Sequence, residues 1–204
     1  DDIDPVDAAM LVTFREVLSC IRYFGIQPTD SVVVIGCGPV GQTYIKFLNL
    51  CGVKNLIAAD IIPEKLEAAK AAGATYTINS KKEDVVARLA EITKGHMADF
   101  VIEGTGIPAL LDGCVDWLKV GRGKLIVMSA YETGPTSFDF RKVVAKSIDM
   151  FVPHPGHCLN PMDDMRRAIA LVNKGTFNVE QLVSHEFKLS DIQTAFENLE
   201  HKPK

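Results

Sequence analysis

A glycine-rich turn between a buried strand and a helix is the feature that most constrains how this chain folds. Residues 31–36 read Ser-Val-Val-Val-Ile-Gly, β-branched and apolar on both faces, as expected of a buried parallel strand. The turn Gly36-Cys37-Gly38-Pro39-Val40-Gly41 follows, and residues 39–50 then carry apolar side chains at helical spacing. The first glycine permits a tight turn, the second lets the backbone approach a ligand, and the third lets helix and strand lie close together. The pattern predicts a strand–turn–helix unit that holds the pyrophosphate of a dinucleotide at the start of the helix.

An acidic residue at the end of the next predicted strand indicates which dinucleotide is bound. Asp60 lies 60 − 41 = 19 residues after the last glycine, close to the spacing of about 20 residues typical of such sites. A carboxylate there accepts hydrogen bonds from the ribose hydroxyls and repels a 2′-phosphate, whereas NADP sites place an arginine nearby. Ile61 and Ile62 follow instead, so we expect NAD(H), with Asp60 and Ile61 at the ribose. Lys65 either reaches the same ribose or is an ordinary exposed lysine, and its position alone leaves both readings open.

The rest of the chain repeats the alternation of short apolar runs and helical patterns that is typical of βα units. The expected strands are 31–36, 55–60, 75–79, 99–103, 124–128 and 148–152. We therefore predict an α/β fold: a doubly wound, six-stranded parallel Rossmann sheet with helices on both faces.

Two terminal helices are also expected. Before the first strand, apolar residues from Met10 to Phe24 recur on one helical face. Near the end of the chain, Ser190 and Gln193 have the spacing of a capping box. The face of that last helix expected to be buried carries Ile192, Phe196 and Leu199.

Composition and charge narrow the class of protein. The formal net charge of −4 does not favour binding to nucleic acid or to an anionic membrane. No apolar run approaches the length of a membrane span. The five cysteines form no CxxC pair and no metal-ligand spacing, which favours reduced thiols in a cytoplasmic protein and predicts no metal site. The chain opens on Asp1 rather than Met, so we expect a preceding segment.

Two alternative functions fit the same residues. An S-adenosylmethionine-dependent methyltransferase also has a glycine-rich first turn and an acidic residue after its second strand, but here the third glycine has the dinucleotide placement. A non-catalytic module that binds or senses NAD fits the motif as well as an enzyme does.

Four segments in order along the chain resemble one family. They are residues 34–41, 58–74, 99–106 and 184–197, and they resemble the cofactor-binding domain of zinc-type medium-chain alcohol and polyol dehydrogenases. The resemblance implies an oxidoreductase that transfers hydride between an alcohol or polyol and NAD, with Lys65 as a ribose contact. It also implies a wall for the adenine and nicotinamide made by Thr105, Gly106, Val127, Met128 and Ser129. The catalytic acid or base is unknown from this chain.

The resemblance also implies a division of the chain and a partner. Residues 1–30 would link from a missing N-terminal catalytic domain that binds the alcohol or polyol, 31–176 would form the NAD-binding Rossmann domain, and 177–204 would return toward the missing domain. Many family members place a zinc ligand where Leu11 and Val12 stand, and neither can bind a metal. The family also pairs its last strand across a two-fold axis, which predicts a homodimer through residues 148–158.

Overall fold

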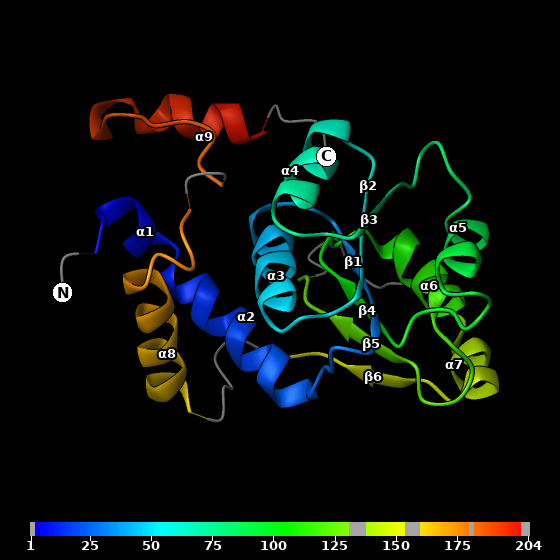
Figure 1. The fold of residues 1–204 in the computed structure, drawn as a ribbon. Coiled ribbons are helices and arrows are strands. Elements are labelled where there is room, and N and C mark those ends of the chain that lie inside the picture. The colour runs from blue at the N-terminus through cyan, green and yellow to red at the C-terminus, as the bar shows by residue number, and fades with distance from the viewer. Residues whose placement is uncertain (1–2, 131–137, 154–159, 180–181, 201–204) are drawn as a thin grey trace.

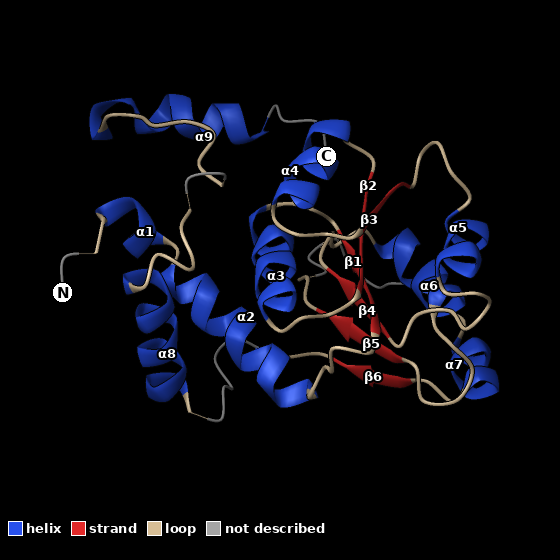
Figure 2. Cartoon of the chain, viewed as in Figure 1, coloured by secondary structure: helices blue, strands red, loops and turns tan. Residues whose placement is uncertain are grey.

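Six parallel strands form the central sheet of this computed structural model, which describes residues 3–130, 138–153, 160–179 and 182–200 (Figures 1 and 2). The strands are β1 (Ser31–Ile35), β2 (Asn55–Asp60), β3 (Tyr76–Asn79), β4 (Phe100–Glu103), β5 (Lys124–Val127) and β6 (Asp149–Phe151). Their order is β3-β2-β1-β4-β5-β6, and every pairing is parallel. The predicted doubly wound sheet is confirmed. Because the chain winds outward from the centre in both directions, the strand order reverses between β1 and β4, where such folds place their ligands.

Helices cover both faces of the sheet (Figure 1). The described helices are α1 (Pro5–Ala9), α2 (Leu11–Phe24), α3 (Pro39–Leu50), α4 (Pro63–Ala71), α5 (Val85–Ile92), α6 (Pro108–Trp117), α7 (Phe140–Lys146), α8 (Pro161–Asn173) and α9 (Ile192–Glu200). Proline is among the first residues of α1, α3, α4, α6 and α8, where its missing N–H breaks no helical hydrogen bond. No described helix has both the length and the apolar content needed to cross a membrane.

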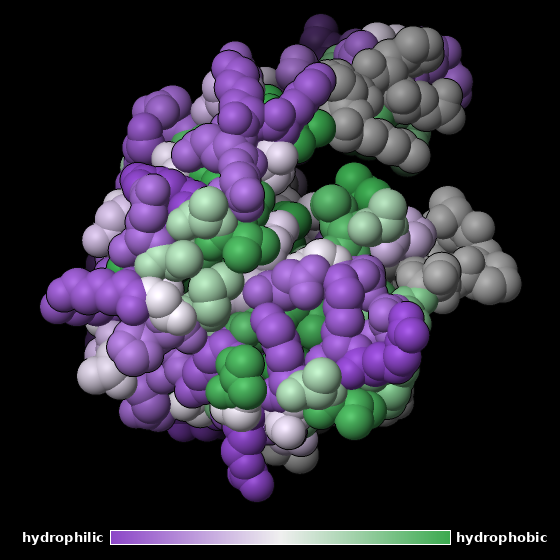
Figure 3. All heavy atoms as spheres, turned by 90° about the vertical axis from the view of Figure 1, so that its right-hand side faces the viewer, coloured by the Kyte–Doolittle hydropathy of each residue, from purple (hydrophilic) through white to green (hydrophobic). Residues whose placement is uncertain are grey.

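The alternation of strand side chains divides the core into two layers. Val32 and Val34 of β1 pack on the side of α2, α3, α4 and α8, while Val33 and Ile35 pack on the side of α5, α6 and α7. All five residues of β1 are buried, as the apolar run in the sequence predicts. The outer surface of the second layer is mainly polar, with scattered apolar residues (Figure 3).

Helix α2 is the predicted amphipathic helix, and it packs against α3 and α8. Phe14 on α2 is fully buried, and its ring lies 4.3 Å from the ring of Phe177, which in turn stacks on Phe47 at 4.5 Å. Phe177 follows α8, so segments from both ends of the chain meet in this aromatic cluster. The first described residues of the expected return segment therefore belong to the same core as the Rossmann unit.

The last helix differs from the sequence-based expectation. A 3-10 turn at Leu189–Asp191 precedes α9, so Ser190 is not its N-cap, and the Ser190 hydroxyl donates to Asp191 while Gln193 donates to Glu197. The predicted capping box is therefore wrong. The face expected to be buried is exposed, with Phe196 60% exposed. Sequence periodicity identifies an apolar face but does not say whether the same chain covers it.

Candidate cofactor site

The glycine turn joins β1 to α3 at the point where the strand order reverses. Gly36 has a φ of +87°, and a Cβ atom there would lie 2.9 Å from the Cγ2 atom of Thr105. At Gly41 a Cβ atom would lie 1.9 Å from the carbonyl oxygen of Gly36, so any side chain would displace the turn. Gly38 is different, because a Cβ atom there would meet nothing within 4 Å. The space in front of Gly38 suits the predicted close approach of a ligand.

The start of α3 offers uncompensated donors beside this space. Gly38 is the N-cap residue and makes no side-chain capping bond. The N–H groups of the first helical turn have no acceptor within the helix, and the helix dipole adds partial positive charge there. Val40, whose backbone belongs to that turn, has a side chain 41% exposed. Together these groups make an anion site of the kind that holds phosphates.

Asp60 ends β2 next to the glycine turn. One oxygen of its carboxylate accepts the N–H of Cys37 at 2.7 Å, and the other accepts the N–H of Ile62 at 2.9 Å. The side chain therefore ties the turn after β1 to the loop after β2. Each carboxylate oxygen can accept more than one hydrogen bond, so the arrangement leaves acceptor capacity for ribose hydroxyls.

Lys65 lies half-buried on the first turn of α4, close enough to the glycine turn to affect its chemistry. Burial, followed by the negative charge of Asp60, raises the pKa of the Cys37 thiol to about 12, and the ammonium of Lys65 opposes that rise. Lys65 and Asp60 therefore both lie near Cys37 in the glycine turn. Cys37 stays protonated at neutral pH and serves as a small apolar residue of the turn.

The loop after β4 is shaped by a buried carboxylate that the sequence analysis did not single out. Glu103 is fully buried at the end of β4, and its carboxylate accepts the N–H groups of Thr105 at 2.7 Å and Gly106 at 3.2 Å, as well as the Thr105 hydroxyl. A glutamate at the end of an otherwise apolar strand was the available signal. A Cβ atom on Gly106 would lie 3.2 Å from the carbonyl oxygen of Ala130. The loop therefore contacts the segment after β5 as well as Gly36.

Met128 follows β5 and faces away from the loop surface. Its sulfur accepts a hydrogen bond from the hydroxyl of Tyr44 at 3.0 Å and lies 3.9 Å from the sulfur of Cys20. Burial is the main cause that raises the pKa of Tyr44 well above its usual value. The Met128 N–H donates to the carbonyl of Glu103 at 2.9 Å. A contact of Met128 with a bound nicotinamide would therefore come from its backbone.

The site residues predicted from the sequence thus gather at the carboxyl ends of the strands. Those near the glycine turn and the loop after β2 are Gly36, Gly38, Pro39, Val40, Gly41, Asp60, Ile61 and Lys65. Those on the loops after β4 and β5 are Thr105, Gly106, Val127, Met128 and Ser129. Their contacts with a cofactor stay predictions.

A zinc site does not fit the described part of the chain. No group of three or more His, Cys, Asp or Glu side chains that could hold a metal gathers in residues 3–130, 138–153, 160–179 and 182–200. Leu11 and Val12 lie on the first turn of α2 and offer no ligand atom. We derive no chemical step through a metal from this chain.

A doubly wound parallel sheet with a glycine cradle at its switch point and an acidic residue ending β2 defines the class of Rossmann-type nucleotide-binding folds. Within that class, residues 39–174 match the family model described as zinc-binding dehydrogenase. The chain belongs to this family, which confirms the resemblance found in the sequence and disfavours the methyltransferase alternative.

Individual relatives agree with the family assignment. Sorbitol dehydrogenase 1 of Saccharomyces cerevisiae is 31% identical over 184 residues, which cover 87% of this chain and 50% of the relative. The structure of benzyl alcohol dehydrogenase from Acinetobacter calcoaceticus superposes with a TM-score of 0.83 at 28% identity, covering 98% of this chain and 56% of that one. A short chain alcohol dehydrogenase from E. coli, complexed with NADH, shares the fold with a TM-score of 0.86 at 24% identity, covering 99% and 58%. The chain spans about half the length of the curated relatives it matches.

Proposed function

We propose that this chain binds NAD(H) across the edge of the sheet between β1 and β4, and that the whole protein transfers hydride between an alcohol or polyol and NAD. The observation that carries the proposal is that the open glycine turn and Asp60 lie next to each other. The carboxylate of Asp60 accepts a hydrogen bond from the N–H of Cys37 in that turn. The E. coli structure containing NADH and the alcohol and polyol dehydrogenases among the relatives support it.

When bound, NAD would supply the hydride acceptor, and this chain would supply orientation. The first turn of α3 would hold the pyrophosphate, and Asp60 with Lys65 would hold the adenosine ribose. The loops after β4 and β5 would flank the nicotinamide. We infer that the substrate is held by another part of the protein, because the chain spans about half the length of its relatives and no group that could hold a metal gathers in the described residues. We further infer a cytoplasmic location, where NAD and reduced thiols are available.

Titration calorimetry with NADH and NADPH tests the proposal directly. The 204-residue chain is expected to bind NADH and to bind NADPH much more weakly, because the carboxylate of Asp60 repels a 2′-phosphate. Addition of alcohols or polyols with NAD is expected to give no reduction by this chain alone. Equal affinity for the two cofactors would contradict the proposal, and turnover would show that this half carries the missing acid–base group.

A further inference from the structure

Gln42 is a buried polar side chain on the first turns of α3, with only 5% of its surface exposed. Its amide nitrogen donates to the carbonyl of Cys37 at 3.2 Å and to the carbonyl of Lys65 at 3.0 Å. One side-chain amide therefore joins the glycine turn after β1 to the first turn of α4 after β2. These are the two segments between which the proposed ribose and pyrophosphate sites lie.

The hydrogen bonds of Gln42 control which way the glycine turn faces. The N–H of Cys37 is bound by Asp60, and the carbonyl of the same residue is bound by Gln42, so both polar groups of Cys37 are directed into the protein. A carbonyl dipole turned toward a pyrophosphate would repel it, whereas N–H groups attract it. By holding the Cys37 carbonyl inward, Gln42 leaves the donors of the turn to face the ligand.

The second hydrogen bond of Gln42 attaches the first turn of α4 to α3. It holds the backbone of Lys65, whose ammonium acts on the turn beside Asp60. If the first turn of α4 were released, Lys65 would be able to move outward and meet a 2′-phosphate. The position of this lysine therefore affects the choice between NAD and NADP as well as the affinity for either.

We propose that Gln42 is a positioning residue that orients the glycine turn for pyrophosphate and holds Lys65 in the place that favours NAD over NADP. This inference rests on the proposed function, since it describes how the same site is kept in shape. Gln42 would touch neither the reacting atoms nor the cofactor, and it would act through the backbone of Cys37 and Lys65.

The test compares wild type with Gln42→Leu by calorimetric titration of ADP-ribose, NAD and NADP. Loss of two neutral hydrogen bonds to the turn and to α4 is expected to weaken ADP-ribose and NAD binding about tenfold. NADP binding is expected to weaken less. The ratio of the affinities for NAD and NADP should therefore fall roughly threefold. Gln42→Met, which keeps the length of the side chain, carries the same expectation if Gln42→Leu does not fold.

Thr93→Val provides a matched control. Thr93 is also buried, and its hydroxyl makes two hydrogen bonds, to the Leu89 carbonyl at 2.6 Å and from the Met97 N–H at 2.9 Å. It lines a depression of about 640 Å³ at the start of β1 and β2, the opposite edge of the sheet from the glycine turn. This variant should lower thermal stability and leave both affinities unchanged.

The outcomes separate the two proposals. Failure of the wild type to bind any of the three ligands would refute the proposed function. If the wild type binds NAD but a folded Gln42 variant has unchanged affinity, the role of Gln42 is wrong and the proposed function stands. The same holds if the ratio of the affinities for NAD and NADP is unchanged in that variant.

Discussion

At the scale of single residues, Asp60 ties the turn after β1 to the loop after β2, and we propose that it also binds the adenosine ribose. Its oxygens accept the N–H groups of Cys37 and Ile62 at 2.7 and 2.9 Å, and the same carboxylate is proposed to accept the ribose hydroxyls. Asp60→Ala is expected to weaken NAD binding roughly tenfold to a hundredfold, the equivalent of charged hydrogen bonds worth ~1.5–3 kcal/mol. Titration calorimetry with NAD measures the change.

ADP-ribose serves as the control ligand for that variant, because it keeps the ribose and lacks the nicotinamide. The same loss of affinity should appear with ADP-ribose if Asp60 acts at the adenosine end. A loss confined to NAD would contradict the placement of Asp60 at that ribose.

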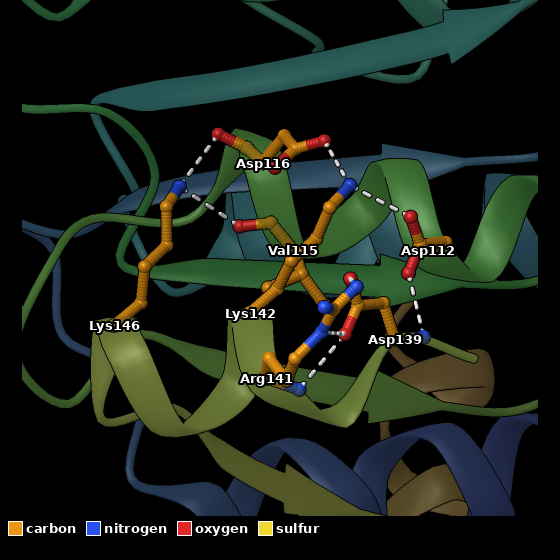
Figure 4. Close-up of polar contacts among 7 residues, drawn as sticks. All are labelled: Asp112, Val115, Asp116, Asp139, Arg141, Lys142 and Lys146. Atoms are coloured by element: carbon orange, nitrogen blue, oxygen red, sulfur yellow. Dashed lines mark hydrogen bonds and ion pairs between the residues drawn. The ribbon is translucent and has the colours of Figure 1, made fainter.

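At the scale of elements, a set of charged side chains fastens α7 to α6 (Figure 4). The ammonium of Lys142 lies 2.7 Å from the Asp112 carboxylate and 2.8 Å from that of Asp116. Lys146 donates to three carbonyls at the end of α6, those of Val115, Asp116 and Leu118. These bonds satisfy acceptors that a helix end leaves open, and they place positive charge at the negative end of the helix dipole. Burial lowers the pKa of Lys146.

Lys142→Ala tests how much this attachment stabilises the protein. Its side chain and both acidic partners are about one-third or more exposed, so each pair should contribute no more than ~1 kcal/mol at neutral pH. The melting temperature is expected to fall by about 2–4 °C per kcal/mol lost for a chain of this size. Thermal unfolding at low and high salt measures the effect, which should shrink as salt screens the pairs. Lys70→Ala, which removes the exposed pair with Glu67, should change stability less.

The same variant has a defined pH dependence. The hydrogen bond from Lys142, followed by that from the N–H of Asp139, lowers the pKa of Asp112 below its ordinary value of 3.8. A carboxylate with a lowered folded-state pKa contributes stability above its unfolded pKa and loses it as the pH falls through the folded value. The difference in stability between wild type and Lys142→Ala should therefore persist at neutral pH, begin to fall near pH 3.8 and disappear as the pH passes below the lowered pKa of Asp112. A difference that grows in acid would contradict this assignment.

At the scale of the whole molecule, β6 leaves one edge of the described sheet open. The N–H of Asp149 donates to the Gly123 carbonyl on the β5 side, so by strand alternation the N–H of Met150 points to the open edge. Residues 148–153 of the expected interface are described, and 154–158 lie outside the described residues. We propose that two copies pair along this edge, which would give an isologous dimer.

Met150→Pro separates edge pairing from packing, because it removes only an outward N–H from the backbone. It is expected to give a folded monomer by light scattering, while the wild type runs as a dimer. Met150→Ala is the control, because it also shortens a side chain that packs partly on the core but keeps the backbone N–H. This variant should remain dimeric. A wild type that is monomeric at high concentration would end the proposal.

The elements and the centre of the candidate site could be predicted from local sequence patterns. Apolar β-branched runs and helical periodicity are local properties, so all six strands and the amphipathic helix α2 were predicted within a few residues. The glycines were also readable from the sequence, because the positive φ of Gly36 and the close approach of Gly41 to the Gly36 carbonyl both belong to one turn. The last helix was predicted as an element, but its exposed face was not.

The contacts between groups far apart in the chain depend on how whole elements pack. The amide of Gln42 reaches Lys65 23 residues away, and Lys142 reaches Asp112 across 30 residues. The loop after β4 meets Gly36 through Thr105 and the segment after β5 through Gly106, contacts that local pattern does not predict. Side-chain hydrogen bonds depend on positions within a few tenths of an ångström, and those positions follow from the packing of whole elements. Local sequence patterns therefore predicted the position of the candidate site. Long-range packing determined which side-chain hydrogen bonds connect its loops.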